Sequence, residues 1–142
     1  MSEADSNARL IREFHDAQNL FYAGGDQEQV RTMLAEDVAW HVPGRSAIAG
    51  DYRGLSEVLR YFVTRRELAQ ATFRIAVRGV LADAERAVIF AEGHVQLGNE
   101  SATWETVAVF RITSGLIAEC WVLPYDQYSF DEIWAASDDR PA

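Results

Sequence analysis

Residues 73–123 read FRIAVRGVLADAERAVIFAEGHVQLGNESATWETVAVFRITSGLIAECWVL, and apolar and polar side chains alternate along most of this stretch. Such alternation is the period of a β-strand with one buried face. A charged break at residues 83–86 and short polar turns at residues 98–100 and 113–115 divide it into four segments. Turns this short join antiparallel neighbours, because parallel strands need a long crossover. The pattern predicts an antiparallel meander with strands near residues 73–82, 87–97, 102–112 and 116–123.

Helical periodicity replaces this alternation in the first part of the chain. Apolar side chains recur at spacings of one to four in residues 7–22, which predicts an amphipathic helix with Ser6 as its N-cap. Asp26 is expected to cap a second, shorter helix that includes Leu34. A third amphipathic segment covers residues 56–69, and charged side chains crowd its last turn. Three helices thus accompany the four strands.

One further strand is expected between the second and third helices. Residues 38–42 are short, β-branched and aromatic, and they stop at a Pro-Gly pair that begins a loop over residues 43–54. An apolar patch at residues 130–134 predicts a short C-terminal helix before a disordered tail at residues 137–142. This order of elements is typical of an α+β protein in which helices pack on one face of a curved antiparallel sheet.

Composition narrows the class of protein further. The 142 residues are 49% hydrophobic, so residues 1–142 are expected to form one globular domain with its own core. The 13 Lys and Arg against 22 Asp and Glu give a net charge of −9, which disfavours nucleic acid and membranes as partners. Residues 1–30 contain no apolar core of a signal peptide, and no stretch approaches about 18 consecutive apolar residues. Neither secretion nor a membrane span is therefore expected.

Cysteine usage points to a reducing environment. The single cysteine, Cys120, allows no internal disulfide, and the sequence has no Cys/His cluster with metal-ligand spacing. We therefore expect a cytoplasmic protein without a metal site. Cys120 itself is expected to be buried and inert, because no basic residue adjoins it in the sequence.

Short motifs along nearly the whole chain point to one family. They are, in chain order, Gly24-Gly25-Asp26, residues 34–38 (LAEDV), residues 40–44 (WHVPG), residues 49–54 (AGDYRG), residues 109–112 (VFRI) and Asp126-Gln127-Tyr128. In this order the chain resembles the ketosteroid isomerase and SnoaL-like proteins of the nuclear transport factor 2 superfamily. The resemblance implies a cone-shaped half-barrel with the order α-α-β-α-β-β-β-β around an apolar pocket. It also implies that no cofactor is used and that the chain forms a homodimer.

The resemblance disfavours two specific chemistries. The family's isomerases use a helix-one tyrosine and a second acid as oxyanion donors, and the corresponding positions here hold Gln18 and Ala108. Steroid isomerisation is therefore not expected. The limonene epoxide hydrolase relatives need an aspartate two residues beyond a last-strand tryptophan, whereas here Leu123 stands two residues beyond Trp121.

Two residues are the candidate proton-transfer groups. The family's isomerases place a catalytic aspartate at the end of the first strand, and counting back from the Pro-Gly turn reaches His41, whereas counting forward from Asp37 reaches Val42. An imidazole at this position can take or return a proton near neutral pH. The alternative for His41 is a structural strand histidine or one at a dimer surface. Asp126, after the last strand, is the second candidate, as an acid or base at the pocket mouth, or alternatively as a helix cap or a solvated carboxylate.

The other two histidines are assigned away from the pocket. His94 shares a strand face with Glu92, and this face is expected to point toward solvent or a partner subunit because the opposite face is more apolar. His15 stands beside Asp16 on the polar side of the first helix, together with Gln18, and is expected to be exposed.

Aromatic and hydroxyl side chains are the candidate groups for binding an apolar ligand, because they combine an apolar body with a polar group. A place in the aromatic core is the alternative for each of the rings. The candidate set is Tyr22, Trp40, Trp104, Thr106, Trp121 and Tyr125.

Together these features favour a cofactor-independent isomerase, cyclase or lyase that moves protons on a hydrophobic, carbonyl-bearing metabolite. The sequence supplies a base without an obvious oxyanion partner. The alternatives are a non-catalytic binder of a hydrophobic small molecule and a dimerisation module that uses the outer sheet face. Val88, Phe90, Val107 and Val109 on that face predict a homodimer.

Overall fold

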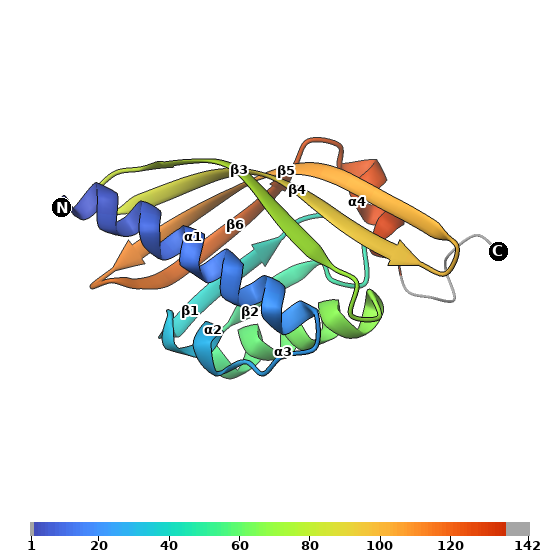
Figure 1. Ribbon diagram of the computed structural model, residues 1–142, viewed down its shortest axis with the longest axis horizontal. Coiled ribbons are helices and arrows are strands. Elements are labelled where there is room, and N and C mark those ends of the chain that lie inside the picture. Colours follow the sequence, from blue (N-terminus) through green and yellow to red (C-terminus); the bar gives the residue numbers. More distant parts are fainter. Residues whose placement is uncertain (1, 136–142) are drawn as a thin grey trace.

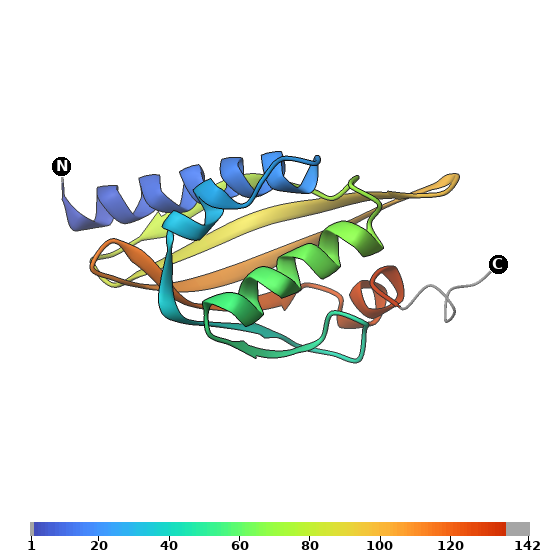
Figure 2. The ribbon, with the colours of Figure 1, turned by 90° about the horizontal axis from the view of Figure 1, so that it is seen from below.

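The computed structural model describes residues 2–135, and it shows a curved, unclosed six-stranded sheet with helices on one side (Figure 1). The elements are α1 (Glu3–Tyr22), α2 (Glu28–Thr32), β1 (Leu34–Val42), β2 (Gly50–Arg53), α3 (Leu55–Leu68), β3 (Arg74–Ala82), β4 (Arg86–Leu97), β5 (Glu100–Thr113), β6 (Leu116–Pro124) and α4 (Gln127–Ile133). The strand order is β2-β1-β6-β5-β4-β3. Both α1 and α3 lie on the same side of the sheet (Figure 2). The predicted α+β half-barrel is confirmed.

The last four strands form the predicted antiparallel meander. β3 pairs with β4, β4 with β5, and β5 with β6. The β5–β6 hairpin turns at Ser114 and Gly115, whose φ angles are 53° and 76°. Two positive φ angles in a two-residue turn match the right-handed twist of the strands that it joins.

The N-terminal edge of the sheet differs from the prediction. Residues 50–53, predicted as loop, form β2, which pairs antiparallel with β1. β1 has nine residues and pairs parallel with β6, so one pairing in the sheet is not antiparallel. Leu34 belongs to β1 and not to the second helix, because the Ile117 N–H donates to the Met33 carbonyl at 2.9 Å and aligns the chain along β6.

The helices follow the prediction with shifted ends. Ser2, not Ser6, caps α1: its hydroxyl accepts from the Asp5 N–H at 3.1 Å, and the Asp5 carboxylate accepts from the Ser2 N–H at 3.4 Å. The short C-terminal helix is confirmed as α4. The tail at residues 137–142 lies outside the described residues. None of the helices in residues 2–135 combines the length and apolar character that a membrane crossing requires.

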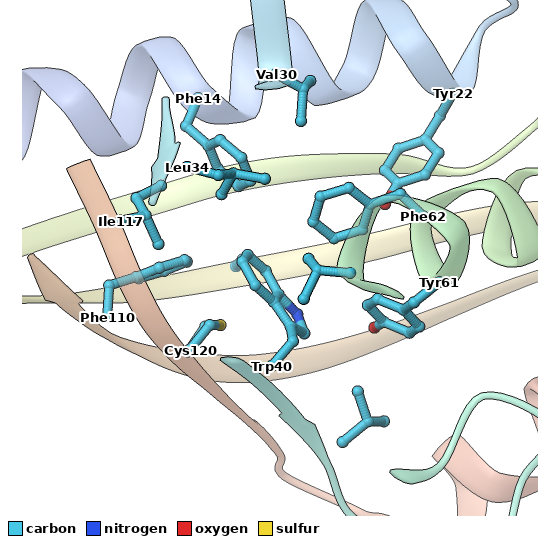
Figure 3. Close-up of a cluster of buried hydrophobic side chains, with 14 of the residues drawn as sticks. Phe14, Tyr22, Val30, Leu34, Trp40, Tyr61, Phe62, Phe110, Ile117 and Cys120 are labelled. Atoms are coloured by element: carbon cyan, nitrogen blue, oxygen red, sulfur yellow. The ribbon is translucent and has the colours of Figure 1, made fainter. Parts of the chain in front are cut away.

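The core fills the space between the helices and the inner face of the sheet. Trp40 of β1 lies at its centre (Figure 3). Its ring centroid lies 5.0, 5.8 and 5.9 Å from those of Phe62, Phe14 and Phe110. Because the side chains of a strand alternate between its two faces, the inward position of Trp40 places its neighbour His41 on the outer face.

Candidate functional site

A cavity lies inside the layer between the helices and the inner face of the sheet. Side chains from α1, α3, α4 and five of the strands form its wall. The space inside it that the centre of a water-sized molecule can reach is about 40 Å³. This is room for a few waters. Most of the wall is apolar, including Phe73, Ile75, Ile89, Phe110, Val122 and Phe130.

Three of the predicted binding residues line this cavity: Trp40, Trp104 and Thr106. The Trp104 ring stacks on Phe73 with centroids 5.6 Å apart and covers Gly93 of β4. A Cβ built on Gly93 would lie 2.3 Å from the Trp104 ring, so only glycine leaves room for the indole there. The shape of this wall therefore depends on Gly93.

Two other candidates, His41 and Trp121, lie on the outer face of the sheet and not in the cavity. Their neighbours Trp40 and Cys120 line the cavity, and adjacent residues of a strand point to opposite faces. His41 and Trp121 are register partners between β1 and β6, and their rings stack with centroids 5.4 Å apart. The prediction that both side chains lie in the pocket is therefore wrong.

The two candidates that follow β6 mark the start of α4. Tyr125 is exposed. Asp126 is the N-cap of α4, and its Oδ1 accepts from the Ser129 N–H at 3.2 Å. This is the capping role named above as the alternative for Asp126. Neither residue is part of the cavity wall, which corrects their predicted position.

His41 is held between two carboxylates. Its Nδ1 lies 2.6 Å from Asp51 Oδ1, and its Nε2 lies 2.5 Å from Glu119 Oε2. Burial alone lowers the pKa of His41, but the hydrogen bonds to both carboxylates outweigh it and raise the pKa. Arg111 Nε lies 3.3 Å from Glu119 Oε1. Because both ring nitrogens donate to carboxylates, this imidazolium has no lone pair with which to accept a proton.

The second histidine pair lies on the outer face, as predicted. His94 Nε2 is 2.8 Å from Glu92 Oε1, and both side chains are partly exposed. Arg78 of β3 lies 3.5 Å from the same carboxylate oxygen. These three residues form a polar group on the surface of the sheet, away from the cavity.

His15, expected to be exposed, is instead buried, with 4% of its surface accessible, and lines the cavity. Its Nδ1 donates to the Ile11 carbonyl at 2.8 Å, because a carbonyl oxygen can only accept. Burial lowers the pKa of His15 to about 4, opposed by the bond to Ile11 and aided by the charge of Arg65. The ring is therefore neutral near pH 7, with its proton on Nδ1 and a lone pair on Nε2.

Gln18 and Arg65 are also buried cavity residues, although the sequence places them among polar side chains. Both contact Tyr22, a predicted binding residue that is buried beside them. The Tyr22 hydroxyl accepts from an Arg65 terminal nitrogen at 2.5 Å and from Gln18 Nε2 at 3.4 Å. Tyr22 thus anchors two polar groups of the wall and is not itself part of it.

A periodicity signal for these three residues was present in the sequence. His15 and Gln18 follow Ile11 at spacings of four and seven, which is the apolar face of α1. Arg65 follows Val58 by seven residues on the apolar face of α3. If helix positions are assigned to a face by their spacing alone, and the residue type is considered only afterwards, all three residues are identified as inward-facing.

This arrangement suits proton transfer inside an apolar cavity. His15 supplies a neutral nitrogen base, and Arg65 supplies a cation on the same wall. The thiol of Cys120 also lines the cavity, and burial raises its pKa well above the usual value, so it stays protonated, as expected from the sequence. Such a site can accept a proton from a ligand and stabilise a negative charge that forms on it.

Several solved structures are similar to this chain. Bal32a from a soil-derived mobile gene cassette is 28% identical with a TM-score of 0.86, covering 94% of this chain and 99% of that one. A protein of unknown function with a cystatin-like fold from Xanthomonas campestris is 23% identical with a TM-score of 0.81, covering 96% and 100%. TerC, co-crystallized with polyporic acid, is 20% identical with a TM-score of 0.75, covering 90% and 97%.

No curated protein matches the sequence significantly. The model of one protein family does match, the SnoaL-like domain, over residues 11–120. That range covers most of the chain, including α2, α3, the strands β1 to β5 and most of α1. The chain therefore belongs to the SnoaL-like domain family.

Proposed function

We propose that this protein is an enzyme that moves protons on a hydrophobic, carbonyl-bearing small molecule bound in the cavity, as an isomerase, cyclase or lyase. The observation that carries the proposal is His15, a buried neutral imidazole in the wall of an apolar cavity. No hydrogen bond within residues 2–135 occupies its Nε2. His15 replaces His41 as the proposed base because both nitrogens of His41 already bind carboxylates.

The proposed step is proton abstraction from the carbon next to the carbonyl. The C–H bond breaks, the proton moves to His15 Nε2, and the electron pair moves onto the carbonyl oxygen as an enolate. Arg65 stabilises that oxygen, since a cation in a low-dielectric cavity interacts strongly with a developing anion. Return of the proton from His15 to another carbon completes an isomerisation.

The low pKa of His15 fits this role when the two charges form together. An imidazolium alone is unfavourable here because burial and Arg65 both oppose it. The enolate that forms in the same step supplies a negative charge to both cations. The ion pair thus forms only during the reaction, and His15 remains a neutral base in the resting protein.

The second candidate function is a non-catalytic binder of a hydrophobic small molecule. The TerC neighbour was co-crystallized with polyporic acid, which supports a small-molecule partner for this chain as well. A binder needs the cavity but not the proton transfer at His15. The two functions therefore differ in what happens to the ligand's C–H bonds.

A small β,γ-unsaturated ketone separates these functions. We expect the protein to convert 3-cyclohexenone to its conjugated isomer and to exchange its α-hydrogens with D₂O, measured by absorbance and NMR. His15→Gln should slow both processes by about 10²–10⁴-fold, the usual effect of losing a general base. His41→Ala is the matched control and should leave the rate unchanged. A rate that survives His15→Gln contradicts the proposed base, and binding without exchange supports the binder.

A further inference from the structure

Arg65 is a buried cation without a carboxylate partner. Only 6% of its surface is accessible, and within residues 2–135 no Asp or Glu forms an ion pair with it. Within the same residues its side chain makes one hydrogen bond, to the neutral Tyr22 hydroxyl, and its Nε has no partner. The remaining surroundings are ring faces, with Cζ 4.5 Å from the Tyr61 centroid and 5.0 Å from that of Phe73.

The ionisable groups around Arg65 cannot supply the missing negative charge at neutral pH. Burial raises the pKa of Tyr22 to about 12, and it raises the pKa of Tyr61 and of Cys120 as well. All three groups are therefore protonated and neutral, whereas a guanidinium stays protonated in proteins. A full positive charge thus lies in the cavity wall, compensated by the surrounding rings only in part.

The same cavity wall also contains neutral hydrogen-bond donors that lack an acceptor in the described part of the chain. The indole nitrogens of Trp40 and Trp134 are buried and have no hydrogen-bond partner among residues 2–135, and both residues line the cavity, as Arg65 does. The buried Tyr61 hydroxyl is also without a partner in this part of the chain, but Tyr61 does not line the cavity. Buried polar groups are normally paired, so the three unpaired donors of cavity-lining residues, Arg65 Nε and the two indole nitrogens, call for an acceptor from outside the chain.

We infer that the ligand of this cavity is an organic anion, a small apolar ring that carries a carboxylate or an ionised enol, whose oxygen binds Arg65. This inference rests on the cavity of the proposed function and adds the charge of its ligand. An anionic oxygen supplies both the missing counter-charge and the acceptor for Arg65 Nε. The rest of the wall is aromatic and aliphatic, which suits an apolar ring.

Two pairs of probes test the charge at constant shape. Benzoate and benzamide differ in charge but hardly in size, and so do ionised 1,3-cyclohexanedione and neutral 3-methoxy-2-cyclohexenone. The first pair tests a carboxylate and the second an enolate. Trp40, Trp104 and Trp134 line the cavity, so tryptophan fluorescence of the full chain reports binding, with calorimetry as a second measurement.

We expect at least one anion to bind the wild-type protein tenfold or more tightly than its neutral counterpart. Arg65→Met keeps an unbranched side chain and should abolish this preference. Arg60→Met is the matched control, because it removes the same charge from an exposed position of α3 and should preserve the preference. If Arg65→Met does not fold, the wild-type comparison still decides, and Arg65→Lys should retain part of the preference.

Equal affinities for both members of each pair in the wild-type protein would overturn the inference, as would a preference for the anion that survives Arg65→Met. Binding of neither member of either pair also overturns it. The result is separable from the proposed function, because no turnover is measured. Anion binding without proton exchange supports this inference and contradicts the proposed enzymatic function. Proton exchange on neutral ketones without a preference for anions supports the enzymatic function and contradicts this inference.

Discussion

His15 links the protonation state of one buried side chain to the stability of the fold. Its pKa is about 4 in the folded protein, because burial opposes the charge, against about 6.5 in an unfolded chain. As the pH falls below 6.5, the unfolded state binds the proton first, so the free energy of unfolding decreases. The decrease from His15 should reach about 2 kcal/mol at pH 5 and about 3 kcal/mol below pH 4.

Urea unfolding between pH 7 and pH 4.5 measures this dependence, with His15→Gln as the comparison. The variant cannot take up the proton at this position, so its stability should fall less steeply with decreasing pH. The informative quantity is the slope and not the absolute stability, because the variant also changes the bond to Ile11. Parallel slopes for the two proteins would mean that His15 is not the buried neutral group described above.

The prediction of single residues succeeded where the residue type and its position in the strand or helix period point to the same face. It failed where the two conflict. Trp40 and Trp104 are aromatic residues at inward positions, and both line the cavity, whereas their role in binding a ligand stays a prediction. His41 was misplaced because a shift of one residue in a strand exchanges the two faces, and the short β1 sequence does not determine that phase. His15 and Gln18 were misplaced because their polar side chains outweighed their helical spacing.

At the level of elements, the meander was predictable and the edge of the sheet was not. The long strands β3 to β6 have an alternating pattern and local turns, so neighbouring sequence determines their pairing. β2 has only four residues, none of them buried, and its sequence resembles a glycine-containing loop. It becomes a strand only because β1 lies beside it, and β1 is positioned by parallel pairing with the distant β6.

Gly93 provides a test of how one strand shapes the cavity. Gly93→Ala adds a methyl group where a Cβ would lie 2.3 Å from the Trp104 ring, so the indole must move. We expect the free energy of unfolding to drop by about 1–3 kcal/mol, as for other overpacked cores. Chemical denaturation measures the loss, and the near-ultraviolet circular dichroism of the tryptophans should change with it.

The control for this prediction is Gly79→Ala in the adjacent strand β3. A Cβ on Gly79 would lie 3.6 Å from Phe90, an ordinary contact, and its φ is not positive. Its effect on stability should stay within about 0.5 kcal/mol. Equal destabilisation by the two variants would show that the loss comes from adding a side chain to a strand and not from the contact with Trp104.

The whole molecule uses the two faces of one curved sheet for different purposes. Along β1 and β6 the inward Trp40 and Cys120 line the cavity. The outward His41 binds the Glu119 carboxylate and stacks on Trp121. Helices α1 and α3 cover the inner face, whereas within residues 2–135 no helix covers the outer one (Figures 1 and 2). We therefore expect a partner subunit to bind the outer face.

The outer face carries exposed apolar side chains. Leu81, Phe90 and Leu123 are 65%, 39% and 47% exposed, and together with the partly exposed Val88 and Val109 they form the outer apolar patch of β3 to β6. Exposed apolar patches on a sheet favour association, and a symmetric dimer buries the same patch on both subunits. We expect a homodimer with twice the 15.9 kDa mass of the chain, measured by sedimentation at micromolar concentration.

Phe90→Glu places a charge in the outer apolar patch and should convert the dimer to a monomer. Leu20→Glu is the matched control, because Leu20 of α1 is 66% exposed but lies on a helix and not on the sheet. It should leave the dimer intact, since the added charge is the same and only the surface differs. A wild-type protein that sediments as a 15.9 kDa species would exclude the dimer, and dissociation by both variants would point to charge repulsion instead of the sheet face.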